Sequence, residues 1–129
     1  MTLQFETIEM DRQKDYLELL RQCNPEASDY SFINLWGWCR EYDLSWAWDG
    51  DLVWIRQRIP SDMYWAPLGR WESIAWEDRL RRHFDSTASF IRIPERLKNL
   101  WEGEFGERLQ YEDAGATGII CMIKPSWSN

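Results

Sequence analysis

Residues 44–57 have the sequence LSWAWDGDLVWIRQ, and this stretch decides the fold. Large apolar side chains alternate with small or polar ones over 44–48, which is the period of a strand with one buried face. Asp49 followed by Gly50 is a strong hairpin signal. Residues 52–55 then supply the return strand, and residues 63–66 predict a third strand. The centre of the chain is therefore expected to be an antiparallel meander.

Helices and further strands are predicted on both sides of this meander. The strand predictions cover 3–8, 89–93 and 108–112, and the helix predictions cover 11–23, 30–42, 73–84 and a segment that begins with Pro94. Asp11 is expected to cap the first helix. The resulting order β-α-α-β-β-β-α-β-α-β predicts an α+β fold with one mixed sheet flanked by helices.

Length and charge narrow the classes of function. The 129 residues suit one domain, and no linker or repeat suggests an internal boundary. The net charge of −7 argues against DNA, RNA or anionic lipid as the main partner. No apolar run approaches the length of a membrane span, and the first residues lack the pattern of a signal peptide. Three widely spaced cysteines favour a reducing compartment, so we expect a cytoplasmic protein.

No catalytic, cofactor-binding or metal-binding residue can be assigned from motifs. His83 is the single histidine and has no partner at metal-ligand spacing, so we expect it near a helix C-terminus. Cys39 lies among aromatic residues, as a small buried hydrophobe does. Residues 115–118, GATG, resemble a phosphate-binding turn only superficially. Arginines 79, 81 and 82 are expected on a solvated helix face.

Ten tryptophans are the unusual feature of the composition. Two interpretations are open for the four in the central strands, which are Trp46, Trp48, Trp54 and Trp65. They could form an aromatic face that binds a ligand or a partner by stacking. They could instead be core residues of a small sheet, which is where large aromatic side chains usually pack.

Residues 24–38, NPEASDYSFINLWGW, carry a resemblance to a known family. The stretch resembles a motif of the domain at the C-terminus of phosphatidylglycerol lysyltransferases, which also occurs in stand-alone cytoplasmic proteins of unknown function. In that family a proline-containing loop precedes Ser-Glu-Tyr-Thr-Phe-Thr-Asn-Leu and a tryptophan-containing helix. Here Asp29 replaces the glutamate, and Ser31 and Ile33 replace the threonines. The resemblance covers about residues 3–114.

The resemblance implies a GNAT-like acyltransferase fold, built in the family from two such units in tandem. Family members transfer an aminoacyl group from aminoacyl-tRNA, and the fold type also serves transfer from acyl-CoA. A basic Lys- and His-containing segment and the second unit follow in the family, and neither is present here. The resemblance therefore implies the truncated N-terminal half of an acyl- or aminoacyltransferase-like protein, inactive by itself, and no catalytic residue is carried over.

Residues 115–129, GATGIICMIKPSWSN, differ in character from the GNAT-like part, 1–114. They contain no acidic residue, although the first 114 residues contain all 22. Codons read from the third base of the Gly115 codon allow GNWDYLYDQAELEQ, which is similar to the continuation in the family. We therefore interpret the segment as an aberrant tail from a frameshift. Such a tail is expected to lie outside the fold, or at most to add to an open sheet edge.

Two functions of different class follow from these observations. The first is the truncated transferase half, whose exposed aromatic residues would promote self-association. The second is a non-catalytic binding module that uses the Trp-rich face, which would require a groove with polar groups beside the tryptophans.

Overall fold

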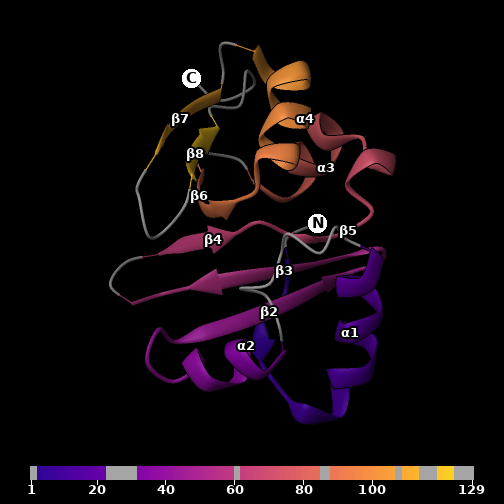
Figure 1. Ribbon diagram of the computed structural model, residues 1–129, viewed down its shortest axis with the longest axis vertical. Helices are drawn as coiled ribbons and strands as arrows, with labels where there is room; N and C mark the ends of the chain where they lie inside the picture. The colour runs from indigo at the N-terminus through magenta and orange to yellow at the C-terminus, as the bar shows by residue number, and fades with distance from the viewer. Residues whose placement is uncertain are drawn as a thin grey trace. The chain divides into compact units, whose positions relative to one another are not determined.

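The structure is a computed structural model that describes residues 3–22, 32–59, 62–84, 88–106, 109–113 and 119–123. The chain forms two compact units (Figure 1). The N-terminal unit contains Leu3–Asp62 and Pro67–Arg70, and the C-terminal unit contains Met63–Ala66 and the chain from Trp71 onward. The sequence shows no linker at this division because the chain crosses between the units within a few residues.

The sheet of the N-terminal unit is antiparallel, in the order β1-β2-β3-β5. Its strands are β1 (Glu6–Thr7), β2 (Leu44–Asp49), β3 (Leu52–Gln57) and β5 (Leu68–Gly69). The β2–β3 hairpin confirms the prediction for residues 44–57, with a shift of one residue in the turn. Asp49 pairs with Leu52, and Gly50 has a φ of 60°. A glycine at the first turn position is typical of a type II′ hairpin.

The helices of the N-terminal unit cover one face of this sheet. They are η1 (Met10–Arg12), α1 (Gln13–Gln22) and α2 (Phe32–Trp38). The predicted cap Asp11 lies inside η1, so α1 begins two residues later than expected. The Tyr16 ring stacks on Trp46 with centroids 5.7 Å apart, and Phe32 lies 6.4 Å from the same tryptophan. All three are buried, so the core of this unit is largely aromatic.

The sheet of the C-terminal unit is mixed, in the order β4-β6-β8-β7. Its strands are β4 (Met63–Trp65), β6 (Ala88–Ile93), β7 (Leu109–Asp113) and β8 (Ile119–Ile123). β4 and β6 are parallel, while β8 is antiparallel to both of its neighbours. The predicted α+β class with a mixed sheet flanked by helices is confirmed at this level.

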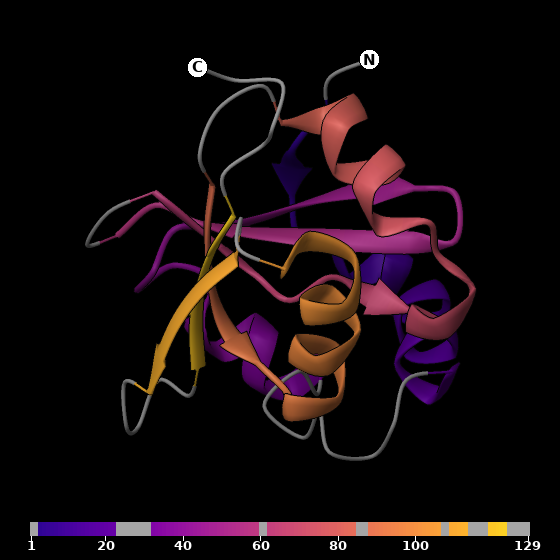
Figure 2. The ribbon, with the colours of Figure 1, turned by 90° about the horizontal axis from the view of Figure 1, so that it is seen from above.

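Two helices accompany that sheet. α4 (Glu95–Phe105) packs beside β7 and β8, and α3 (Trp76–His83) packs on α4 (Figures 1 and 2). Pro94 is the N-cap of α4 rather than its first residue. The short helix η3 (Trp71–Ser73) precedes α3, and Trp76 Nε1 donates a hydrogen bond of 3.1 Å to the Trp71 carbonyl. Trp101 lies 5.5 Å from Trp76 between ring centroids, in an edge-to-face arrangement.

β8 corrects the expectation that residues 115–129 lie outside the fold. Five of them, Ile119–Ile123, form β8, which lies between β6 and β7 rather than at an edge (Figure 2). Isoleucine has a high preference for strands, so this segment suits a sheet whatever its origin. The frameshift itself stays a prediction.

Candidate functional site

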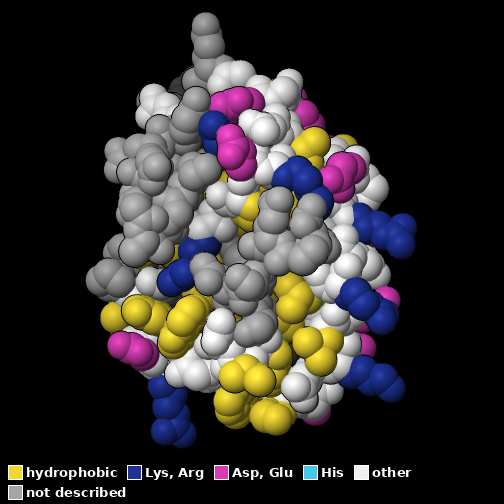
Figure 3. Space-filling view, in the orientation of Figure 1, with side chains coloured by type: hydrophobic (Ala, Val, Ile, Leu, Met, Phe, Trp, Pro, Cys, Tyr) yellow, Lys and Arg dark blue, Asp and Glu magenta, His cyan; other side chains and the backbone are white. Residues whose placement is uncertain are grey.

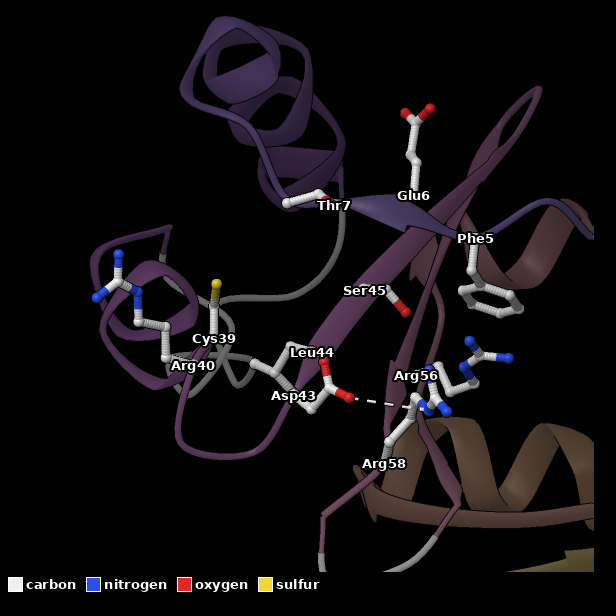
Figure 4. Close-up of a pocket in the computed structure, with 10 residues that line it drawn as sticks. All are labelled: Phe5, Glu6, Thr7, Cys39, Arg40, Asp43, Leu44, Ser45, Arg56 and Arg58. Atoms are coloured by element: carbon white, nitrogen blue, oxygen red, sulfur yellow. Dashed lines mark ion pairs between the residues drawn. The ribbon is translucent and has the colours of Figure 1, made fainter.

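A hollow of about 520 Å³ lies on the N-terminal unit, beside β1, β2 and the turn after α2 (Figure 4). We call it the basic hollow because three arginines line it. Its lining residues are Phe5, Glu6, Thr7, Cys39, Arg40, Asp43, Leu44, Ser45, Arg56 and Arg58. Its volume lies in the range of small-molecule pockets.

Strand register brings the polar residues of the basic hollow together. Thr7 pairs with Ser45 across β1 and β2, and Ser45 pairs with Arg56 across β2 and β3. Directly opposed residues of antiparallel strands point to the same face, so the three side chains form one row. Figure 4 shows the Ser45 hydroxyl and the guanidinium groups of Arg56 and Arg58 on the same side of the strands. Arg40 extends away from this group.

Arg56 in β3 and Arg58 just after it differ in their surroundings. Arg58 Nε lies 3.8 Å from an Asp43 carboxylate oxygen and 4.0 Å from one of Asp62, and its side chain is more than half exposed. Ion pairs this long and this exposed contribute little. The Arg56 guanidinium lies over the Phe5 ring, 4.7 Å from the centroid. Among the described residues, no carboxylate pairs with Arg56.

Two atoms of the row are buried and lack a hydrogen-bond partner among the described residues. They are Ser45 Oγ and Arg56 Nε. Buried polar atoms in folded proteins nearly always have a partner, and each exception calls for an explanation. Both atoms belong to residues that line the basic hollow.

The four tryptophans singled out in the sequence do not form one face. Trp46 and Trp48 share a face of β2, with centroids 5.3 Å apart. Trp54 pairs with Ala47, whose side chain points to the opposite face from Trp46 and Trp48, and its Nε1 donates to Asp49 at 3.2 Å. Trp65 belongs to the C-terminal unit, where the Arg92 guanidinium lies 4.8 Å from its ring centroid.

Burial favours the core interpretation for three of these tryptophans. Trp46, Trp54 and Trp65 have no exposed side-chain surface. Trp48 is half-buried, and the Arg12 guanidinium lies 4.0 Å from its ring centroid. A stacking platform needs exposed ring faces, and in the structure only Trp48 of the four offers any.

Of the remaining sequence candidates, Cys39 lines the basic hollow, while the others lie apart from it or outside the described residues. His83 is the last residue of α3, at the helix C-terminus where it was expected. Cys39 is half-buried, with a free thiol at the edge of the basic hollow. Arg82 pairs with Asp78 at 3.1 Å on the exposed side of α3. The GATG segment, 115–118, lies outside the described residues, and the described part of the chain contains no cluster of potential metal ligands.

Sequence reasoning missed Phe5, Ser45, Arg56 and Arg58 as a group. Arg56 lies in β3 and Arg58 is the first residue after it, and a separation of two residues places side chains on one face of an extended chain. That spacing could have flagged the pair. Phe5 and Ser45 could be added only after the strand register was known.

Large apolar side chains are exposed on the N-terminal unit. Figure 3 shows hydrophobic side chains gathered in the lower part of the view, over this unit. The most exposed are Ile33 at 81%, Met10 at 52%, Ile59 at 50%, Leu17 at 45% and Trp36 at 44%. No helix in the described part of the chain is long and apolar enough to span a membrane.

One solved structure is similar in fold. It is the crystal structure of a conserved protein of unknown function from Bacteroides thetaiotaomicron VPI-5482, with a TM-score of 0.65 and 16% sequence identity. The match covers 88% of this chain but 40% of that protein, so the chain spans less than half of that protein's length. No family model and no curated protein matches the chain. At this identity the likeness concerns the fold alone.

Proposed function

We propose that this chain corresponds to the N-terminal half of a longer acyl- or aminoacyltransferase-like protein and catalyses no transfer by itself. The observation that carries the proposal is the uneven coverage of the Bacteroides structure. Nearly the whole chain, 88%, superimposes on only 40% of that longer protein. The motif at 24–38, which resembles the phosphatidylglycerol lysyltransferase domain, supplies the chemical class.

The α+β fold is compatible with this proposal, and the GNAT-like identity of the fold is part of it. In the resembled family, the protein is built from two such units in tandem. The basic segment follows the part of the family that this chain resembles. The donor would be aminoacyl-tRNA or acyl-CoA. A single half would offer neither the complete donor site nor the acceptor site.

The alternative, a non-catalytic binding module with a Trp-rich face, has weaker support. Trp46 packs against Tyr16 and Phe32, so its face of β2 is occupied by the helices of its own unit. Trp54 points to the other face of the same sheet. Neither face presents the exposed row of rings that the alternative requires.

The proposal is tested by comparing two proteins made from the same locus. The first is residues 1–129, and the second is the longer product obtained by restoring the reading frame at codon 115. We expect the short protein to show no turnover with acetyl-CoA or aminoacyl-tRNA, and the long protein to bind one of these donors. Saturable donor binding with turnover by residues 1–129 would overturn the proposal. So would downstream DNA that encodes no Lys- and His-containing segment in any frame.

A further inference from the structure

We infer that the basic hollow of the N-terminal unit binds a small organic anion, whose carboxylate or phosphate oxygens contact Arg56 and Ser45 and whose apolar part lies against Phe5. This inference does not depend on the proposed transferase ancestry. It rests on three observations: the row of polar residues across three strands, the two buried atoms without partners, and the unbalanced charge of Arg56.

The row gives the hollow its donors. Thr7, Ser45 and Arg56 are adjacent across β1, β2 and β3, so their side chains converge on one face. A guanidinium presents several N–H donors in a fixed plane, which matches the oxygens of a carboxylate or a phosphate. A hydroxyl beside it can donate to the same oxygens. The strands hold this geometry rigid, since each member of the row lies in a paired position of the sheet.

The two buried atoms without hydrogen-bond partners indicate that an acceptor is the missing group. Ser45 Oγ and Arg56 Nε are buried and have no hydrogen-bond partner among the described residues. Arg56 Nε can only donate. Leaving such a donor without a partner is unfavourable. An anion in the hollow reaches these two atoms only when the Ser45 and Arg56 side chains turn toward it, and it would then remove both deficits.

The local charge fixes the sign of the ligand. Arg58 already has two carboxylate neighbours, Asp43 and Asp62. Arg56 has the Phe5 ring instead of a carboxylate, with the guanidinium 4.7 Å from the ring centroid. A protein with a net charge of −7 repels anions in general, so an anion site needs a local positive charge of this kind.

The apolar wall limits the ligand to an organic anion of moderate size. Phe5 is half-buried and lines the hollow. The volume of about 520 Å³ exceeds what one inorganic phosphate fills. An aromatic or branched aliphatic carboxylate, or a phosphate monoester of similar size, suits this combination of donors and apolar surface.

The experiment is calorimetric titration of residues 1–129 with phenyl phosphate, benzoate, inorganic phosphate and the neutral benzyl alcohol. We expect saturable binding of phenyl phosphate or benzoate that weakens with added salt. The stronger of the two identifies the oxyanion as phosphate or carboxylate. Inorganic phosphate should bind less tightly, because it lacks the part that contacts Phe5. Equal binding of benzyl alcohol would overturn the inference, as would no saturable binding of either organic anion.

Variants locate the site. Arg56→Gln should weaken binding about tenfold or more, since a charge-assisted hydrogen bond is lost, and Arg56→Lys should recover part of it. Arg82→Gln is the matched control, because it removes the same charge from an arginine paired with Asp78 on α3. Equal losses in Arg56→Gln and Arg82→Gln would contradict a specific site.

Ser45→Ala provides an independent test of the site if Arg56→Gln fails to fold. It removes one donor without changing charge, and we expect about a threefold to tenfold loss of affinity. Amide chemical shifts measured with each anion should move at Thr7, Ser45 and Arg56. Shifts confined to other strands, or an unchanged affinity in Ser45→Ala with an intact fold, would overturn the inference.

Discussion

Replacement of Gly69 by alanine should destabilise the N-terminal unit more than any other single-methyl change that the structure suggests. Gly69 lies in β5 and pairs with Leu52 of β3. A Cβ added there would lie 2.3 Å from the Asp51 carbonyl oxygen and 2.7 Å from Leu52 Cδ2. Leu52 is fully buried, so its side chain has no free space to enter.

Two terms set the size of the effect. Forcing an extra methyl into a packed region costs about 1–3 kcal/mol. The φ of 155° at Gly69 is disfavoured for alanine and adds on the order of 1 kcal/mol. We therefore expect a loss of about 3 kcal/mol in the free energy of unfolding. For a chain of this length that corresponds to roughly a 10 °C lower midpoint.

Gly37→Ala is the matched control in the same unit. Gly37 lies in α2, where an added Cβ meets no atom within 4 Å. Alanine favours a helix over glycine by about 1 kcal/mol, so this variant should be unchanged or slightly more stable. Urea unfolding should be followed both by circular dichroism and by tryptophan fluorescence, so that separate unfolding of the two units would be detected. A Gly69→Ala variant within 0.5 kcal/mol of the parent, on the order of a surface change, would refute the reasoning.

Four further outcomes are expected. Trp46→Ala should cost about 3–5 kcal/mol in urea unfolding because a fully buried ring is removed, and a loss under about 1 kcal/mol would contradict its core role. Glu104→Ala should cost about 1 kcal/mol, since its carboxylate accepts from two backbone N–H groups at the start of α3 at 3.2 Å each. The control Glu102→Ala removes a 3.7 Å ion pair with Lys98 and should cost at most about 0.5 kcal/mol, the size of an i,i+4 helix pair. Ile33→Glu should reduce concentration-dependent association in sedimentation velocity, because this side chain is 81% exposed, and unchanged association would place the contact elsewhere. Truncation after residue 114 should lower the unfolding midpoint and remove hydrogen-exchange protection from β6 and β7, because both strands pair with β8. An unchanged midpoint would show that β8 contributes nothing to stability.

Local patterns in the sequence predicted most of the elements, but not β5 or β8. The alternation over 44–48 and the glycine at 50 define the β2–β3 hairpin, because side-chain direction and turn conformation depend on neighbouring residues alone. The same alternation correctly placed Trp46 and Trp48 on one face. The helix periodicity located α3 and α4 within a few residues, and Pro94 marked the start of α4.

The basic hollow and the order of the strands were decided by tertiary structure. Trp54 faces away from Trp46 because the hairpin register pairs it with Ala47, and a shift of one residue would have reversed this. Thr7 and Ser45 are 38 positions apart and meet only through β1–β2 pairing. β8 lies between β6 and β7, although β7 precedes it in the chain. Such pairings join distant segments through backbone hydrogen bonds that any β-prone residue can make, so no local pattern encodes which strand is the neighbour.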